Sequence, residues 1–441
     1  MSANPLSWRD SMISLAAIVK VFSVFGIVLV LNRLKLSLSI ALLVGSAALG
    51  LWMHMGPVSL AQSVAHSLMD IQTVGLALIV GIILVMSRLM KQTGHLDRIV
   101  TSFTALSRDP RITGAVMPAL IGLLPMPGGA LFSAPMVDTA LCDNRMTGEE
   151  KTAVNYWFRH IWEYWWPLYP GVVLAVALLK VEAWRFMAIM LPMTLVSVLA
   201  GTLFILRPMG ALQSHSSATQ GGKGTIRQFI REIMPIIVLV AAILVQGAAV
   251  SILRILGSNV AIPGSISILP ALAICTLWVC LQNRIPFRQI LHAVTDKSIP
   301  PMLLLVLAIM VFKGVMGDSH AIVQIRDELM AHHIPILVVV MLMPFISGMI
   351  TGIAIGFVGT SFPLIVPMFP TTDLLTYLSW AALAYSFGYM GMMLSPVHLC
   401  FLVTKDYFNA TLSRSYRYLI FPALAVMATA SFLFVASRFI V

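Results

Sequence analysis

The chain has 441 residues, of which 59% are hydrophobic and 10% are charged, whereas soluble domains carry about 25% charged residues. This composition excludes an ordinary soluble globular protein. The net charge of +11 does not require a nucleic-acid partner, because basic residues in a membrane protein mark its cytoplasmic loops. We therefore expect an all-α polytopic membrane protein whose surroundings are the lipid bilayer. The four cysteines lack metal-ligand spacing, so we expect neither a metal site nor a cofactor.

Apolar runs long enough to cross a bilayer need about 20 residues each. They lie near residues 11–32, 36–53, 71–87, 156–178, 186–206, 233–253, 265–282, 299–316, 376–404 and 418–438. Two further apolar stretches, 112–142 and 334–369, are interrupted by proline and glycine. Lipid cannot satisfy the backbone groups that such breaks free, so we expect two re-entrant hairpins buried in protein. Weakly apolar segments are expected to be surface helices or connectors: 57–69, 91–107, 286–297 and 319–332.

A polar stretch at 213–224 has linker composition and divides the chain near its midpoint. Tyr156 and Pro167 have the same spacing as Tyr385 and Pro396, at an offset of 229 residues, and two further anchor pairs have offsets of 226 and 232. Anchors in the same order at nearly one offset indicate an internal repeat. We predict a first repeat over 1–206, a cytoplasmic linker over 207–231 and a second repeat over 232–441.

The basic residues predict the orientation of these repeats. If the N-terminus lies outside, the cytoplasmic loops hold 19 of the 28 Lys and Arg residues and the outer side holds six. Five crossings per half is an odd number, so the second repeat runs through the membrane inverted relative to the first. We predict an integral protein of the cytoplasmic (plasma) membrane with both termini outside.

Interrupted segments in corresponding places of two inverted repeats indicate a transport site near the midplane. Helix N-termini at the hairpin tips offer free N–H groups to an anion, while the alternative is that the small residues only allow close helix packing. The substrate-binding candidates in the hairpins and the second broken helix are Pro127, Gly128, Gly129, Ser133, Thr351, Gly352, Thr360, Ser361, Ser386 and Ser395.

A second group of candidates lies in the run 155–171. On a helix, Arg159 and Glu163 are four residues apart and face each other, and prolines further on break the helix. Arg159 is a candidate clamp for a carboxylate, and Glu163, His160 and Asp138 are candidate proton carriers. Asp138 fits a hairpin base equally well. His398, in the second half, fits a packing residue or a polar group of the site.

The alternative for the run 155–171 is an interfacial position, at which its aromatic residues form a membrane belt. Those residues are Trp157, Trp162, Tyr164, Trp165 and Trp166.

The run 123–137, together with Arg159 to Glu163 and Pro167 to Pro170, resembles the integral membrane family known as domain of unknown function 401. The similarity covers essentially the whole chain, and the stretch from Leu124 to Gly128 is also similar to a loop of gluconate permeases. The chain further resembles the ion-transporter superfamily. That resemblance implies a homodimeric elevator carrier for anions, with a scaffold from the early helices of each half and a moving domain from the hairpins and broken helices.

The sodium-coupled dicarboxylate branch of that superfamily carries a Ser-Asn-Thr triplet at each hairpin tip, which this sequence lacks. The resemblance therefore favours a proton over a sodium ion. We interpret the chain as a secondary active transporter of a small anion, an organic acid, coupled to protons. The alternatives are a sodium-coupled carrier of the same fold, a channel, or an intramembrane enzyme. The sequence lacks the His-Glu-x-x-His zinc pair and the Gly-x-Gly-Asp motif, which argues against an enzyme.

Overall fold

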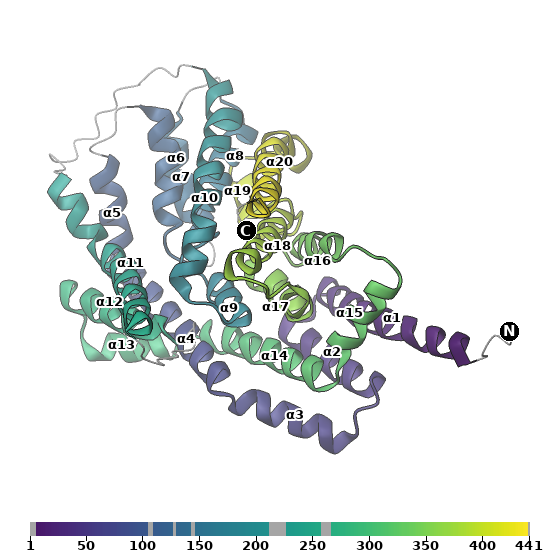
Figure 1. Cartoon of the computed structure of the whole chain (residues 1–441). Helices are drawn as coiled ribbons and strands as arrows, with labels where there is room; N and C mark the ends of the chain where they lie inside the picture. Colours follow the sequence, from purple (N-terminus) through teal and green to yellow (C-terminus); the bar gives the residue numbers. More distant parts are fainter. Residues whose placement is uncertain are drawn as a thin grey trace.

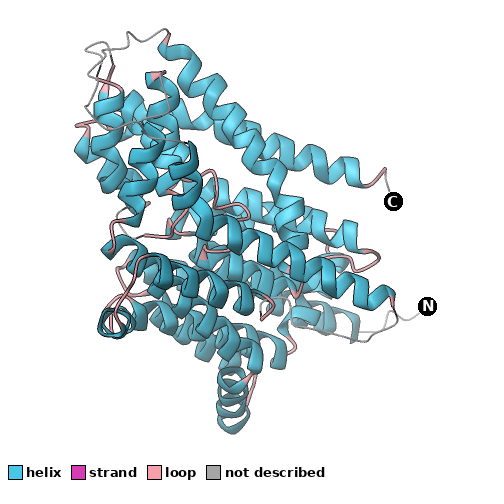
Figure 2. Cartoon of the chain, turned by 90° about the vertical axis from the view of Figure 1, so that its left-hand side faces the viewer, coloured by secondary structure: helices cyan, strands magenta, loops and turns pink. Residues whose placement is uncertain are grey.

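A computed structural model describes residues 6–104, 109–126, 129–142, 146–210, 226–256 and 266–439. This part of the chain consists of helices joined by loops and contains no strand (Figure 2). The predicted helical class is therefore confirmed. The polar stretch at 213–224, Pro127 and Gly128 lie outside the described residues.

Helices long and apolar enough to cross a membrane are five in number among the described residues. A helix of about 20 residues rises roughly 30 Å, the thickness of the hydrocarbon core. The five spans are Ile71–Gln92, Ala183–Met209, Ile226–Leu253, Ile299–Asp318 and Leu412–Ser437. The remaining predicted runs also contain helices, but several of these are shorter, and two of the runs are broken by turns.

In the described part of the chain, the α-helices fall into two sets of ten that follow a similar order of lengths. The first set is α1 (Leu6–Arg33), α2 (Leu38–Trp52), α3 (Pro57–Met69), α4 (Ile71–Gln92), α5 (His95–Thr104), α6 (Pro110–Ile121), α7 (Gly129–Ala140), α8 (Gly148–Arg159), α9 (Pro170–Leu179) and α10 (Ala183–Gly201). The second set is α11 (Ile226–Ile255), α12 (Ile268–Gln282), α13 (Phe287–Val294), α14 (Ile299–Asp318), α15 (Ala321–Ala331), α16 (Ile336–Thr351), α17 (Ala354–Ile365), α18 (Leu374–Met393), α19 (Leu399–Tyr407) and α20 (Leu412–Ser437). The segments expected as connectors correspond to α3, α5, α13 and α15.

The two sets interleave in space rather than forming two separate halves. The first five helices of each set pack together, with α2 on α14 and α12 on α4; α2, α3 and α14 lie at the bottom of Figure 1, and α5 and α11 lie at its left. The last five helices of each set also pack together, with α9 on α17 and α19 on α7, and α6, α8 and α20 lie in the upper part of the picture. Each half of the sequence thus contributes to both bodies, and the hairpins and broken helices lie in the same body.

Two helix pairs match the predicted hairpins. The first is α6 and α7, which are separated by a break that begins after Ile121. The second is α16 and α17, which are separated only by Gly352 and Ile353. Gly352 has a φ of +64°, a left-handed conformation that glycine adopts without strain. The second break is narrower than the predicted interruption, because Gly348 lies inside α16, where a Cβ would come within 2.2 Å of the carbonyl oxygen of Gly388.

Two broken helices follow the hairpins. The run 156–178 is divided into α8, which ends at Arg159, and α9, which begins at Pro170. The run 376–404 is divided in the same way between α18, which ends at Met393, and α19, which begins at Leu399. Pro170 stands at the first helical position of α9, where its missing N–H costs nothing.

Candidate functional site

The carbonyl groups freed at the first hairpin break are bound by aromatic side chains from the run after α8. Trp162 Nε1 donates to the Ala119 carbonyl at 2.8 Å, and Trp166 Nε1 donates to the Leu123 carbonyl at 2.8 Å. The hydroxyl of Tyr169 donates to the carbonyl of the residue that follows α6, at 2.5 Å. Protein donors therefore replace water at this break, as a break within a bilayer requires.

These contacts contradict the interpretation of the aromatic residues as a membrane belt. A belt residue faces lipid headgroups, whereas Trp157 and Tyr164 are each 1% exposed and Trp166 is 3% exposed. Trp157 Nε1 also donates to the Ser197 carbonyl inside the protein, at 2.9 Å. The rings are packed within the helical body because they fill and satisfy the broken segment.

Two glycines bring the first hairpin against the end of α8. A Cβ on Gly122 would lie 2.0 Å from the carbonyl oxygen of Arg159, so only glycine fits this crossing. A Cβ on Gly129, the first residue of α7, would lie 2.4 Å from Nη2 of the same arginine. The guanidinium of Arg159 therefore rests directly on the N-terminus of α7.

Arg159 is 2% exposed and has few partners for its five donors. Its Nη2 donates to the Met126 carbonyl at 3.2 Å. Among the described residues, its Nε and Nη1 have no hydrogen-bond partner. A buried charge without compensation costs several kcal/mol, and here it also faces the positive end of a helix. The arrangement is suited to an anion.

The expected pairing of Arg159 with Glu163 does not form among the described residues. That expectation needed a helix through both positions, but α8 ends at Arg159 and the residues after it form turns. The Glu163 carboxylate instead lies 3.8 Å from Nε2 of His160. Tyr385 and Tyr389 stabilise the turns, because their hydroxyls donate to the carbonyls of Glu163 at 2.8 Å and His160 at 2.6 Å.

Asp138 lies apart from this group. Its side chain is 47% exposed, and its carboxylate is 2.6 Å from Nζ of Lys151. The geometry supports the hairpin-base alternative for Asp138, since an exposed carboxylate paired with lysine needs no buried partner.

Hydroxyl groups of the second hairpin are mostly used inside the protein. Thr351 donates to the Ser347 carbonyl at 2.8 Å, Thr360 to the Gly356 carbonyl at 2.8 Å, and Ser361 to the Phe357 carbonyl at 2.6 Å. These bonds are typical of hydroxyls that pack within helices. The second broken helix differs. Ser386 is fully buried, and its hydroxyl has no partner among the described residues.

The loop after α18 packs against the tip of the second hairpin. Ser395 donates to the Met349 carbonyl at 2.6 Å. A Cβ on Gly352 would lie 3.1 Å from both the Ser395 hydroxyl and the backbone nitrogen of His398. Gly352 therefore brings the second hairpin close to the second helix break, as Gly129 does for the first hairpin and Arg159.

A polar network that the sequence did not predict connects three helices behind the first hairpin. The Ser133 hydroxyl donates to Oδ1 of Asn155 at 2.6 Å. Nδ2 of Asn155 donates to the Ala130 carbonyl at 3.0 Å and to the Thr404 hydroxyl at 3.1 Å. The hydroxyl of Ser133 is thus occupied by α8 and α19. Asn155 in an apolar run was the available signal for this network.

The two halves of the chain meet at a pair of histidines. Nε2 of His160 lies 3.2 Å from Nε2 of His398, although 238 residues separate them. The hydroxyl of Tyr156 donates to the Met393 carbonyl at 3.0 Å, at the end of α18. The structure therefore unites Gly129, Arg159, His160 and Glu163 with the second helix break.

A groove of about 410 Å³ lies between α1 and the tip of the second hairpin. It is lined by Gly26, Leu29, Val30, Arg33, Met349, Ile350, Pro396 and Val397. The last four residues flank the second hairpin tip and the second helix break. The groove thus lies between the first helix and the body that contains the hairpins.

The fold and site define an all-helical membrane protein with a buried cationic centre between broken helices. No curated protein matches the chain. The family described as protein of unknown function (DUF401) matches residues 14–436. The chain belongs to this family, which confirms the resemblance to domain of unknown function 401.

Proposed function

We propose that this protein is a secondary active transporter of a small anion, an organic acid, and that Arg159 binds the anionic group. The observation that carries the proposal is the buried guanidinium, which rests on the N-terminus of α7 and keeps Nε and Nη1 without partners among the described residues. A carboxylate matches the fork of arginine donors. Binding the anion would offset the cost of burying the charge.

The arrangement of helices supports a carrier rather than a fixed pore. Helices α1 to α10 and α11 to α20 follow a similar order of lengths, as two repeats would. We propose that the repeats are inverted and that the body containing the hairpins moves against the body formed by α1–α5 and α11–α15. The interleaved packing of the two sets supports this elevator mechanism. The groove beside α1 lies where the two bodies meet.

Glu163 is the proposed carrier of the coupled proton. It is 7% exposed, and its carboxylate faces His160 rather than a lysine or an arginine. An ionised carboxylate at this position would repel an anion bound at Arg159, so protonation of Glu163 favours anion binding. Proton and anion then bind together. His160 is the neighbouring alternative, while Asp138 is too exposed for this role.

We further propose that the protein works as a homodimer in the cytoplasmic membrane with both termini outside, as the superfamily resemblance and the distribution of basic residues imply.

The test begins with a thermal-shift screen of the purified protein against organic acids, followed by uptake measurements in proteoliposomes at about pH 6 and about pH 8. Arg159→Lys keeps the charge but loses the bidentate fork, so it should weaken binding of the anion strongly. Glu163→Gln should bind the anion but lose the pH dependence of uptake. Wild-type affinity in Arg159→Lys would refute the assignment of the anion site.

If uptake by Glu163→Gln keeps its pH dependence, His160 and not Glu163 carries the coupled proton. Lys180→Arg, an exposed position at the end of α9, is the matched control for a change of cationic side chain and should leave uptake unchanged.

A further inference from the structure

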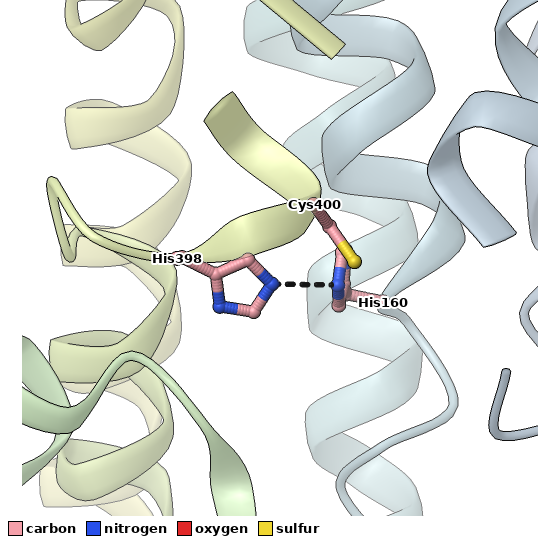
Figure 3. A group of neighbouring side chains, drawn as sticks. All are labelled: His160, His398 and Cys400. Atoms are coloured by element: carbon pink, nitrogen blue, oxygen red, sulfur yellow. Dashed lines mark hydrogen bonds between the residues drawn. The ribbon is translucent and has the colours of Figure 1, made fainter. Parts of the chain in front are cut away.

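Three potential metal ligands converge where the two helix breaks meet. His160 caps the end of α8, His398 caps the start of α19, and Cys400 is the second residue of α19. Their donor atoms all lie within 4.8 Å of one another. Figure 3 shows the His398 ring pointing at His160 from the opposite chain segment, with the Cys400 sulfur beside the His160 ring. No other such group of three occurs among the described residues.

The hydrogen bond to the outer nitrogen of His160 leaves a lone pair on the nitrogen that faces His398. Its Nδ1 lies 2.6 Å from the Tyr156 carbonyl, which can only accept, so Nδ1 carries the proton and Nε2 presents a lone pair. A backbone carbonyl that fixes the outer nitrogen in this way is typical of metal-binding histidines. The outer nitrogen of His398, Nδ1, has no partner among the described residues. It can therefore hold a proton while Nε2 of His398 binds a metal.

The spacing of the nitrogens suits a tetrahedral ion. Zinc binds histidine nitrogen at about 2.0–2.1 Å, so two nitrogens on a tetrahedral ion lie about 3.3 Å apart. The observed distance between the two Nε2 atoms is 3.2 Å. The Tyr156 ring holds both imidazoles, with ring centroids 4.8 Å from His160 and 5.2 Å from His398. The two nitrogens are thus already positioned to bind one ion, and Cys400 on the first turn of α19 is the third ligand.

The ligand types and charges select the ion. Two imidazoles and a thiolate suit zinc and disfavour calcium or magnesium, which take oxygen ligands. A divalent ion beside Arg159 needs negative charge nearby. The Cys400 thiolate supplies one, and the Glu163 carboxylate, 3.8 Å from Nε2 of His160, supplies a second. These two charges balance a divalent ion while Glu163 is ionised.

We propose that His160, His398 and Cys400 form a zinc site with its fourth position open. The alternative for this cluster is that the two histidines share a proton and Cys400 only packs beside them. A zinc ion would link the broken helix of the first half to that of the second, and it would remove His160 from proton transfer, leaving Glu163 for that role. The inference does not depend on transport, because metal binding tests it alone.

The test uses the full-length protein, purified in detergent and stripped of metal with a chelator. Co²⁺, which takes the same ligands as Zn²⁺ and absorbs light, is titrated into the protein. We expect one Co²⁺ per chain, a thiolate-to-cobalt charge-transfer band, and displacement of both by Zn²⁺. Cys400→Ser should abolish the band, and His398→Gln should weaken Co²⁺ binding by more than about tenfold.

Cys275→Ser is the matched control, since that thiol is also buried but lies against the Pro235 carbonyl at 3.2 Å. It should keep the band and the affinity. Absence of Co²⁺ binding to the wild type, or a band that survives in Cys400→Ser, would overturn the zinc site. A second readout covers poor folding of the cysteine variant. Zn²⁺ should raise the Tm of the wild type and of Cys275→Ser but not of His398→Gln, and an equal rise in all three would also refute the proposal.

Discussion

Gly129→Ala separates the role of the Arg159 guanidinium from the stability of the fold. The added Cβ would lie 2.4 Å from Nη2, whereas ordinary contacts begin at 3.4 Å, so the guanidinium must move by about 1 Å. The guanidinium is the end of a flexible side chain, so the backbone can stay in place. Alanine also favours a helix over glycine by roughly 0.5–1 kcal/mol. We therefore expect a folded protein with a Tm close to that of the wild type.

The displaced guanidinium should nevertheless bind the anion poorly. In catalysis a misplacement of about 1 Å can cost on the order of 10²-fold in rate, which we take as the upper end of the loss in affinity. We expect the Kd to rise by about 10-fold to 100-fold, measured by isothermal titration calorimetry with the anion that the thermal-shift screen identifies. The Tm without ligand is measured on the same samples.

Two other glycines provide the comparison. In Gly122→Ala the Cβ would lie 2.0 Å from a backbone oxygen, which cannot move freely, so we expect destabilisation of at least about 1–3 kcal/mol. In Gly317→Ala nothing lies within 4 Å, so the Kd should not change and the Tm should not fall. Wild-type affinity in Gly129→Ala would refute the role of the guanidinium, and a loss of Tm equal to that of Gly122→Ala would show that the position serves packing alone.

Three further predictions concern the hairpin, an exposed carboxylate and the topology. Trp166→Phe leaves a buried hairpin carbonyl without its donor and should cost about 1–3 kcal/mol, seen as a lower Tm. The control is Trp278→Phe, because Nε1 of Trp278 donates to Gln282 in an exposed hydrogen bond, and its Tm should not fall. Equal losses in the two variants would contradict the reasoning. Hydrogen bonds from Thr411, which caps α20, lower the pKa of Glu149 below its usual 4.5. The stability that the ionised carboxylate contributes above that pH is lost as the pH falls. The Tm of Glu149→Gln should therefore fall less steeply in acid than that of the wild type, and identical profiles would refute this. A thiol introduced by Ser59→Cys should react with an impermeant reagent applied outside cells, while the exposed Cys142 should not; the reverse pattern would overturn the proposed orientation.

The sequence was sufficient for the helices and their breaks because both are local properties. Proline removes a donor and glycine opens the left-handed region, so interruptions at the two hairpins were visible without a structure. The predicted runs correspond to helices for a similar reason, since about 20 apolar residues suffice for a span. The sequence overestimated the length of the second break. Gly348 lies inside α16, which is unbroken there, and allows that helix to pack closely on α18.

The site itself depended on contacts that local patterns do not encode. The expected pair of Arg159 and Glu163 assumed that the helix continued to Pro167, but α8 ends eight residues earlier. Tyrosines from α18 bind the freed carbonyls and make the turn stable, and nothing near residue 160 in the sequence indicates them. Likewise, the proximity of His160 and His398 follows from packing between the two halves.

Each half of the chain supplies a tyrosine that binds a backbone carbonyl at the helix break of the other half. This exchange is the strongest argument that the halves are related. Tyr156 and Tyr385 are matched by the proposed repeat, at an offset of 229 residues. The hydroxyl of Tyr156 donates to the Met393 carbonyl at the second break, and that of Tyr385 donates to the Glu163 carbonyl at the first. Equivalent side chains thus satisfy the backbone of the opposite half, as two repeats crossing in one body would require. Since lipid offers no replacement for these donors, each break is stable only when the other half is packed against it. The site therefore depends on both halves of the chain and not on either one alone.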